Sequence, residues 1–216
     1  MVRSVRAMTG KWVPARPFES GYVCYLEFEN GVPASIVYGG CGYFDIAEIL
    51  WWVGESGVAR NPDTNLRARA SFKKIDYPRR EKVLEEMKEK VRYGAAGLGI
   101  GPSHAGWGGQ QSVGQPEKHQ PFFGLTVASC EKGDIRQSPD GIFIYGDEGK
   151  REIPLPPAIG QRQAEFAELY EAIVNDRVPA HDGRWGQATL EVCLAVRQSA
   201  AERREIYLSH QVPVVD

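Results

Sequence analysis

Two histidines, a tryptophan and a lysine stand in one glycine-rich stretch of the chain. The stretch covers residues 94–121 and contains His104, Trp107, Lys118 and His119. Imidazole and ammonium groups donate hydrogen bonds to anionic or hydroxylated ligands, and an indole ring supplies an apolar wall. An exposed loop with incidental histidines is the plainer interpretation of this stretch. The sharper interpretation is a loop that folds over a small-molecule pocket.

Cofactor and metal motifs do not fit this stretch. A dinucleotide fingerprint requires G-x-G-x-x-G between a strand and a helix. Gly97 and Gly99 are spaced correctly, but Pro102 takes the third position, and a charged segment precedes them instead of an apolar strand. No tight spacing of Cys, His, Asp and Glu supplies a set of metal ligands. We therefore expect no bound cofactor and no metal, which disfavours a metal-dependent hydrolase.

Three more polar residues have types and positions that suit binding or catalysis. Arg136 falls on a predicted strand and is able to pair with a substrate carboxylate. Asp45 and Glu48 have the spacing of paired carboxylates, but they precede and open an apolar helical repeat, so a helix cap and its partner is the preferred interpretation. No catalytic residue is assigned. The predicted substrate-binding residues are His104, Trp107, Lys118, His119 and Arg136.

The elements that must position these residues form two runs of strands with helices between and after them. Residues 21–39 alternate apolar groups on both faces and predict a hairpin with a type I′ turn at Asn30-Gly31. Residues 122–155 predict an antiparallel meander. Helices are predicted over residues 46–53, 77–94, 161–176 and 183–205, while residues 55–74 are polar and irregular. The pattern is typical of one α+β domain over residues 1–216, with a long irregular insertion at about 94–121.

Composition and charge exclude several partners. The net charge of −2 gives no reason to expect nucleic acid. No apolar run approaches the roughly 20 residues that span a bilayer, so we expect no membrane association and a cytoplasmic location. Cys24, Cys130 and Cys193 sit in apolar runs, which predicts buried free thiols in a reducing compartment.

The two ends of the sequence resemble a known family. "VPAHDGRWGQATLEVCLAVRQSAAERREIYL" is similar to the C-terminal signature of the Gfo/Idh/MocA oxidoreductases, through Asp182, Gly183, Ala188, Thr189, Ala195 and Ser199. "VRSVRAMTGKWVPARPFESGYVCYLEFENG" and the later "CEKGDIRQSPDGIFIYGDEG" resemble the branch of phthalate cis-dihydrodiol and 4,5-dihydroxyphthalate dehydrogenases. The resemblance covers almost the whole chain, but only as the C-terminal domain of that family.

The resemblance implies an open-faced, mostly antiparallel sheet with helices packed on one face. It also implies a homo-oligomer formed through the other face. The family's Rossmann domain, its Glu-Lys-Pro lysine and its histidine helix have no counterpart here, and the similarity begins at Val2, where the first strand of the family's large sheet begins. We therefore expect NAD or NADP to bind in the full-length protein and not to this chain.

The implied function is that of the substrate-binding and oligomerisation domain of an NAD(P)-dependent dehydrogenase of aromatic catabolism. Its substrate would be an aromatic-acid dihydrodiol or a related hydroxylated ring, as in phthalate degradation. The chain alone is expected neither to bind NAD(H) nor to turn over a dihydrodiol. A stand-alone, non-catalytic binding or scaffold module of the same fold is the alternative.

Overall fold

The fold is described from a computed structural model, in which the chain forms two compact units. Unit 1 comprises residues 1–43 and 162–216, and unit 2 comprises residues 44–161. The second unit is therefore inserted into the sequence of the first. The structure describes residues 1–13, 19–40, 42–54, 57–76, 79–83, 85–86, 119–121, 123–157 and 163–213.

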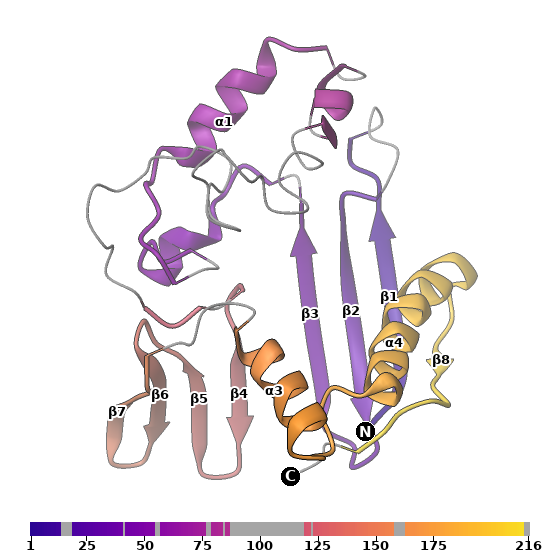
Figure 1. The fold of residues 1–216 in the computed structure, drawn as a ribbon. Helices are drawn as coiled ribbons and strands as arrows, with labels where there is room; N and C mark the ends of the chain where they lie inside the picture. The colour runs from indigo at the N-terminus through magenta and orange to yellow at the C-terminus, as the bar shows by residue number, and fades with distance from the viewer. Residues whose placement is uncertain are drawn as a thin grey trace. The chain divides into compact units, whose positions relative to one another are not determined.

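The sheet of unit 1 has the strand order β3-β2-β1-β8 (Figure 1). Strand β1 (Val2–Gly10) pairs antiparallel with β2 (Gly21–Phe28), which pairs antiparallel with β3 (Pro33–Gly39). The two-residue strand β8 (Ile206–Tyr207) adds to the other edge of β1. The predicted hairpin is thus confirmed, and the antiparallel open sheet agrees with the expected fold class.

The turn between β2 and β3 differs from the predicted type I′ turn. Gly31 has a φ of 79°, but Asn30 does not have a positive φ. The backbone N–H of Gly31 donates to the carbonyl of Phe28, and the N–H of Phe28 donates to the carbonyl of Val32. This is the pattern of a three-residue loop with glycine in the left-handed position, the next most common hairpin connection.

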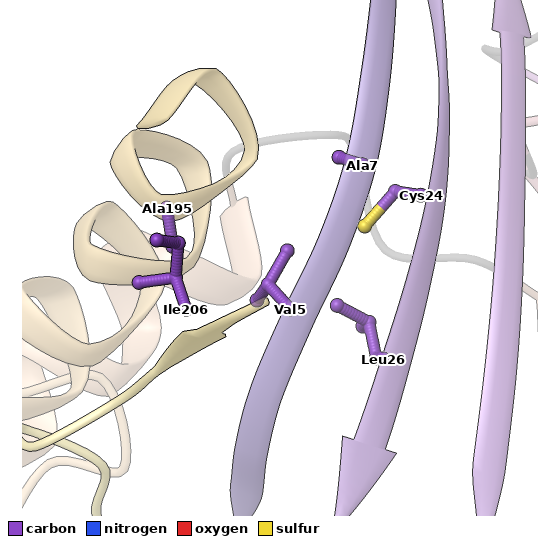
Figure 2. Packing of buried hydrophobic residues seen from close by; sticks show 6 residues of the cluster. All are labelled: Val5, Ala7, Cys24, Leu26, Ala195 and Ile206. Atoms are coloured by element: carbon purple, nitrogen blue, oxygen red, sulfur yellow. The ribbon is translucent and has the colours of Figure 1, made fainter. Parts of the chain in front are cut away.

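The core of unit 1 lies between this sheet and helix α4 (Gly183–Glu202). Figure 2 shows Val5, Ala7, Cys24 and Leu26 of β1 and β2 beside Ala195 and Ile206, and all six are buried. Small residues on α4 permit this close packing: Ala188, Ala195 and Ser199 are its buried residues. Asp182 caps the helix by accepting a hydrogen bond from the Trp185 N–H at 2.8 Å.

The second apolar side of α4 is not buried. Leu190 and Leu194 remain 58% and 54% exposed, although their helical spacing suggests packing on this side as well. The thiol of Cys24 is buried, and burial raises its pKa. Cys130 and Cys193 are exposed, contrary to the prediction from their apolar neighbours.

Helix α3 (Gln163–Val174) forms where its period predicts it. Its apolar residues are nevertheless exposed: Phe166, Leu169, Tyr170, Ile173 and Val174. The loop after it is fastened to the helix, because the Glu168 carboxylate accepts hydrogen bonds from the His181 N–H and pairs with its Nδ1 at 2.7 Å.

The face of the sheet opposite the buried residues is open. Because successive residues of a strand point to opposite faces, the residues next in sequence to the buried ones point toward this open face. Register places Met8 opposite Val23, and Val23 opposite Val37. These three and Tyr25 are 71%, 51%, 75% and 50% exposed, respectively. We call these four residues the open face.

Unit 2 contains a second antiparallel sheet of order β4-β5-β6-β7. Its strands are β4 (Val127–Cys130), β5 (Gly133–Gln137), β6 (Gly141–Gly146) and β7 (Gly149–Pro154). They form the predicted meander, although β4 is shorter than the apolar run from residue 122 suggests. Helix α1 (Thr64–Lys73) forms in a segment predicted to be irregular. Residues 79–83 and 85–86 are helical, within the predicted helix 77–94.

The segment from residue 45 to residue 60 folds back on itself in unit 2. Asp45 caps the 3₁₀ helix η1 (Ile46–Leu50) through the Ala47 N–H at 3.1 Å and pairs with Arg60 at 2.9 Å. The Arg60 N–H donates to the carbonyl of Trp52 at 2.6 Å. The cap is as predicted, but Trp51 ends the helix in place of Gly54. Trp51 and Trp52 both adopt positive φ, a conformation that costs bulky residues energy.

No helix among the described residues is long and apolar enough to cross a membrane.

Candidate functional site

The structure describes two of the five residues predicted to bind substrate. His119 and Arg136 both belong to unit 2. His104, Trp107 and Lys118 lie outside the described residues. The two described residues are held in different ways, and each has partners that the sequence reasoning did not identify.

Arg136 lies on β5 and is stacked among aromatic rings. Its guanidinium carbon is 5.1 Å from the ring centre of Trp51, 5.0 Å from that of Phe143 and 5.8 Å from that of Tyr145. Its Nε donates a hydrogen bond of 2.9 Å to the Tyr145 hydroxyl. This bond fixes the plane of the guanidinium group. Among the described residues, no carboxylate pairs with Arg136.

Lys150 approaches the same rings from strand β7. Its Nζ is 3.6 Å from the ring centre of Phe143 and 5.7 Å from that of Tyr145. Cross-strand register explains the meeting, since Phe143 is opposite Arg136 and Tyr145 is opposite Lys150. Glu148-Gly149 is a turn signal in the sequence. Counting residues outward from that turn pairs Tyr145 with Lys150, so this pair could have been predicted.

His119 is held by its backbone and by its side chain. Its N–H donates to the carbonyl of Gly57 at 2.8 Å, and its Nδ1 lies 2.8 Å from Asp140 Oδ1. Gly57 has a φ of 77°, and a Cβ there would lie 2.2 Å from the His119 carbonyl oxygen, so only glycine allows this approach. Asp140 was missed because it was assigned only to a turn. An imidazole whose Nδ1 is held by a carboxylate presents Nε2 for exchange of a hydrogen bond or proton.

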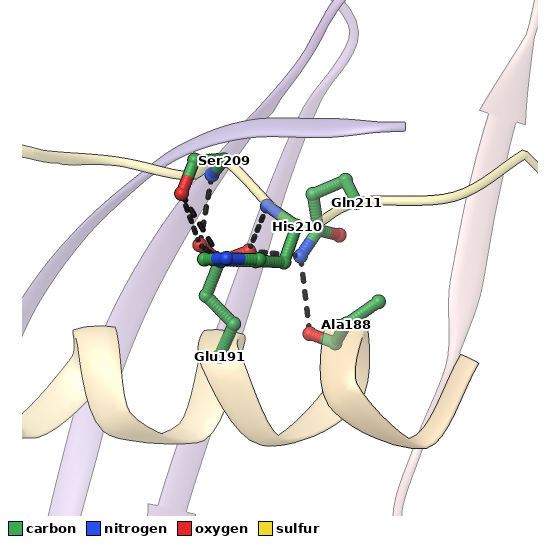
Figure 3. Close-up of polar contacts among 5 residues, drawn as sticks. All are labelled: Ala188, Glu191, Ser209, His210 and Gln211. Atoms are coloured by element: carbon green, nitrogen blue, oxygen red, sulfur yellow. Dashed lines mark hydrogen bonds and ion pairs between the residues drawn. The ribbon is translucent and has the colours of Figure 1, made fainter. Parts of the chain in front are cut away.

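Unit 1 has a pocket of about 500 Å³ near the C-terminal end of the chain. Helix α4 and the segment after β8 form its walls, including Leu190, Leu194, Tyr207 and His210. Figure 3 shows that its main acid, Glu191, faces the segment Ser209–Gln211. The carboxylate accepts hydrogen bonds from the N–H groups of Ser209 and His210, at 2.8 and 2.9 Å, and from Gln211 Nε2 at 2.9 Å. Because these polar groups satisfy one another, we interpret the arrangement as a clip that holds the C-terminal segment.

The clip makes a pH-dependent contribution to stability. Burial alone would raise the pKa of Glu191, but hydrogen bonds from Gln211, Ser209 and His210 outweigh it and lower the pKa from 4.5 to about 2. A lowered folded-state pKa stabilises the fold above pH 4.5, and the stabilisation disappears as pH falls toward 2. We expect Glu191→Gln to cost about 1–2 kcal/mol at pH 7 and nothing below pH 2, as measured by thermal unfolding across this pH range.

A matched control is Glu165→Gln on α3, since Glu165 is exposed and has no hydrogen-bond partner among the described residues. Its difference from the parent protein should stay near zero at every pH. A Glu191→Gln deficit that is the same at pH 2 and pH 7 would contradict the charged clip.

In the described part of the chain, no site fits a metal ion or a dinucleotide. There, no three His, Cys, Asp or Glu side chains gather closely enough to hold a metal ion. Every strand pair in the described sheets is antiparallel. The strand–glycine loop–helix unit that cradles a pyrophosphate belongs to parallel β-α-β folds, so we derive no step through a nicotinamide group on these residues.

No protein-family model matches the chain. The 1-carboxy-3-chloro-3,4-dihydroxycyclohexa-1,5-diene dehydrogenase of Comamonas testosteroni is 29% identical over 200 residues, which cover 90% of this chain and 46% of that protein. A crystal structure of a candidate dehydrogenase from Bordetella bronchiseptica is 32% identical, with a TM-score of 0.70 over 96% of this chain and 49% of that one.

A more distant structure shares the fold. The oxidoreductase of Agrobacterium radiobacter, solved with NAD⁺, L-tartaric acid and magnesium, is 13% identical, with a TM-score of 0.51 over 95% of this chain and 43% of that one. The chain spans about half the length of the curated relative and of both structures. The resemblance seen in the sequence is thereby confirmed: the homologues of this chain are dehydrogenases of the Gfo/Idh/MocA type, and it corresponds to about half of their length.

Proposed function

We propose that the chain forms the substrate-holding and subunit-pairing part of an NAD(P)-dependent dehydrogenase that acts on a carboxylated ring diol. The observation that carries the proposal is the match over 200 residues to a Comamonas testosteroni enzyme whose name specifies a carboxylated, dihydroxylated cyclohexadiene. The similarity to the Bordetella bronchiseptica protein, at 32% identity and a TM-score of 0.70, supports the same class.

In such a reaction a nicotinamide bound elsewhere in the full protein would supply hydride transfer, and this chain would hold and orient the ring acid. Unit 2 of this chain, which contains His119 and Arg136, then supplies the walls for the ring acid. Another part of the full protein supplies the dinucleotide domain and the proton-transfer groups. Support for this division comes from the half-length match to the relatives.

The proposal assigns His119 and Arg136 to the substrate. His119 is anchored at the Gly57 backbone and at Asp140, so its imidazole is fixed before any ligand arrives. Arg136 is equally fixed by its stacking and by the Tyr145 hydroxyl. Preorganised polar groups of this kind lose little entropy on binding. His104, Trp107 and Lys118 are proposed to approach the same ligand, from outside the described residues.

The proposal also assigns the open face to subunit pairing. Met8, Val23, Tyr25 and Val37 offer apolar surface on neighbouring strands, and contiguous exposed apolar patches are typical of interfaces. A homo-oligomer formed through this face would bury the four residues at once.

The decisive experiment uses the longest reading frame that contains this chain. We expect it to oxidise at least one carboxylated cis-dihydrodiol from a small panel when NAD or NADP is supplied, with reduced nicotinamide measured at 340 nm. The neutral dihydrodiols of the same rings are the control substrates. Turnover of none of the carboxylated diols with either cofactor would sink the proposed function.

A further inference from the structure

Arg136 and Lys150 form an unusual pair of neighbouring cations in unit 2. Both cations lie over the rings of Phe143 and Tyr145, one from β5 and one from β7. Aromatic rings attract cations, but two like charges over the same rings repel each other. A negative charge between them would relieve this repulsion.

Among the residues that the structure describes, no acid provides that charge. Asp134 and Glu152 lie on the same face of the sheet, opposite Tyr145 and Phe143 in register. Neither forms an ion pair with Arg136 or Lys150 in the part of the chain that the structure describes. The four terminal N–H groups of Arg136 likewise have no acceptor among the described residues, since its one hydrogen bond uses Nε.

We infer that Arg136 and Lys150 form a carboxylate subsite, which binds a planar, unsaturated carboxylic acid. The fork of terminal N–H groups on Arg136 matches the two oxygens of a carboxylate, and the ammonium of Lys150 adds a point charge. Trp51 is 39% exposed and tilted at 60° to Phe143, with ring centres 6.0 Å apart. Its indole gives the ligand ring an apolar surface beside the charges.

The subsite deepens the proposed function, because it rests on that proposal for the identity of the ring but not for the binding of the acid. It explains how the protein would select an ionised ring acid over the neutral diol, because the two positive charges attract a carboxylate and not an uncharged ring.

The test is a calorimetric titration of the 216-residue chain with benzoate, benzamide and acetate. Benzoate should bind, whereas benzamide, which keeps the ring but loses the charge, and acetate, which keeps the charge but loses the ring, should each bind at least about tenfold more weakly. Benzamide binding as tightly as benzoate would overturn the inference. So would a failure of all three probes to bind at millimolar concentrations.

Single substitutions of charged residues on β5 and β7 test the subsite, and one of them is a matched control. Lys150→Gln should weaken benzoate binding about threefold to fivefold and Arg136→Gln about tenfold, in line with the worth of charge-assisted hydrogen bonds. Arg151 is the next residue on β7 and faces the other side of the sheet, opposite Ile144, so Arg151→Gln should leave the affinity unchanged. An equal loss in the Arg151 variant would show a mere effect of net charge and overturn the subsite.

Arg136→Lys guards against a folding artefact, because it keeps the charge and loses the fork and the Nε donor. It should bind benzoate with an affinity between those of the parent and Arg136→Gln, with the parent's thermal unfolding profile. These titrations need no cofactor and no turnover. Benzoate binding through Arg136 in a protein whose full reading frame oxidises no diol would therefore reject the proposed function and keep the subsite.

Discussion

Val37→Glu is expected to dissociate the proposed homo-oligomer into monomers. Val37 is 75% exposed and faces away from α4, beside Val23 and Tyr25 on the neighbouring strand β2. Pairing through the open face would bury the new carboxylate among apolar side chains, and an unpaired buried charge costs several kcal/mol. We expect the dissociation constant to rise at least about a hundredfold, measured by sedimentation velocity over a micromolar concentration series.

The control for this substitution is Val32→Glu. Val32 is also exposed, at 51%, but it lies in the loop between β2 and β3 and not on the open face. The same charge there should leave the dissociation constant unchanged. If the Val37→Glu protein sediments as the parent oligomer does, the open face is not the interface. If the parent protein is monomeric at 100 µM, the proposed oligomer is wrong.

Ser199→Ala should be the most destabilising conservative substitution in unit 1. Ser199 is fully buried; its hydroxyl accepts a hydrogen bond from the Ala7 N–H at 2.9 Å and donates one to the Arg204 carbonyl at 2.6 Å. Alanine leaves a backbone donor on β1 and a backbone acceptor after α4 without partners, each at about 1–3 kcal/mol. We expect a loss of about 2–4 kcal/mol, measured by urea unfolding.

Thr189→Ala on the same helix is the matched control. The Thr189 hydroxyl also donates to a backbone carbonyl, that of Trp185 at 3.0 Å, but it is exposed to solvent. Water replaces that bond, so the change should stay within about 0.5 kcal/mol. Equal effects at the two positions would mean that Ser199 does not join α4 to β1.

Local sequence patterns were enough to predict the strands and the two C-terminal helices. Alternation in residues 21–39 and the meander in residues 122–155 have period 2, and α4 has a cap at Asp182 and a small-residue stripe, so sequence and tertiary packing agree. Helix α1 was missed because its ten residues carry no apolar stripe. A helix with so little apolar surface gives the periodicity nothing to detect.

Burial was harder to predict than secondary structure. Leu190 and Leu194 repeat at helical spacing, yet both stay exposed. The side of α4 that packs on the core carries Val192, Ala195 and Val196, and the buried residues of the helix are small ones, as a close approach to the sheet requires. The type I′ turn failed for a related reason. Asn30-Gly31 indicates a tight turn, but the loop length, set by the pairing of Leu26 with Ala34, decides which residue takes the positive φ.

The candidate site was predicted in part. Arg136 was chosen for its charge on a strand, but its aromatic neighbours and Lys150 come from other strands, and only register brings them together. His119 was chosen for its type, whereas its partner Asp140 is 21 positions away. Such pairs depend on three-dimensional contacts that no local pattern in a single sequence reveals.

The insertion of unit 2 into unit 1 has a consequence for synthesis on the ribosome. The hydrogen bond between Ala7 and Ser199 spans 192 positions, and that between Ser4 and Glu205 spans 201. At about 5–20 residues per second, α4 emerges roughly 10–40 s after the strands it covers. During that interval the three-stranded hairpin has apolar side chains exposed on both faces. We therefore expect nascent chains of this protein to depend on chaperones, since unpaired strands of this kind aggregate readily.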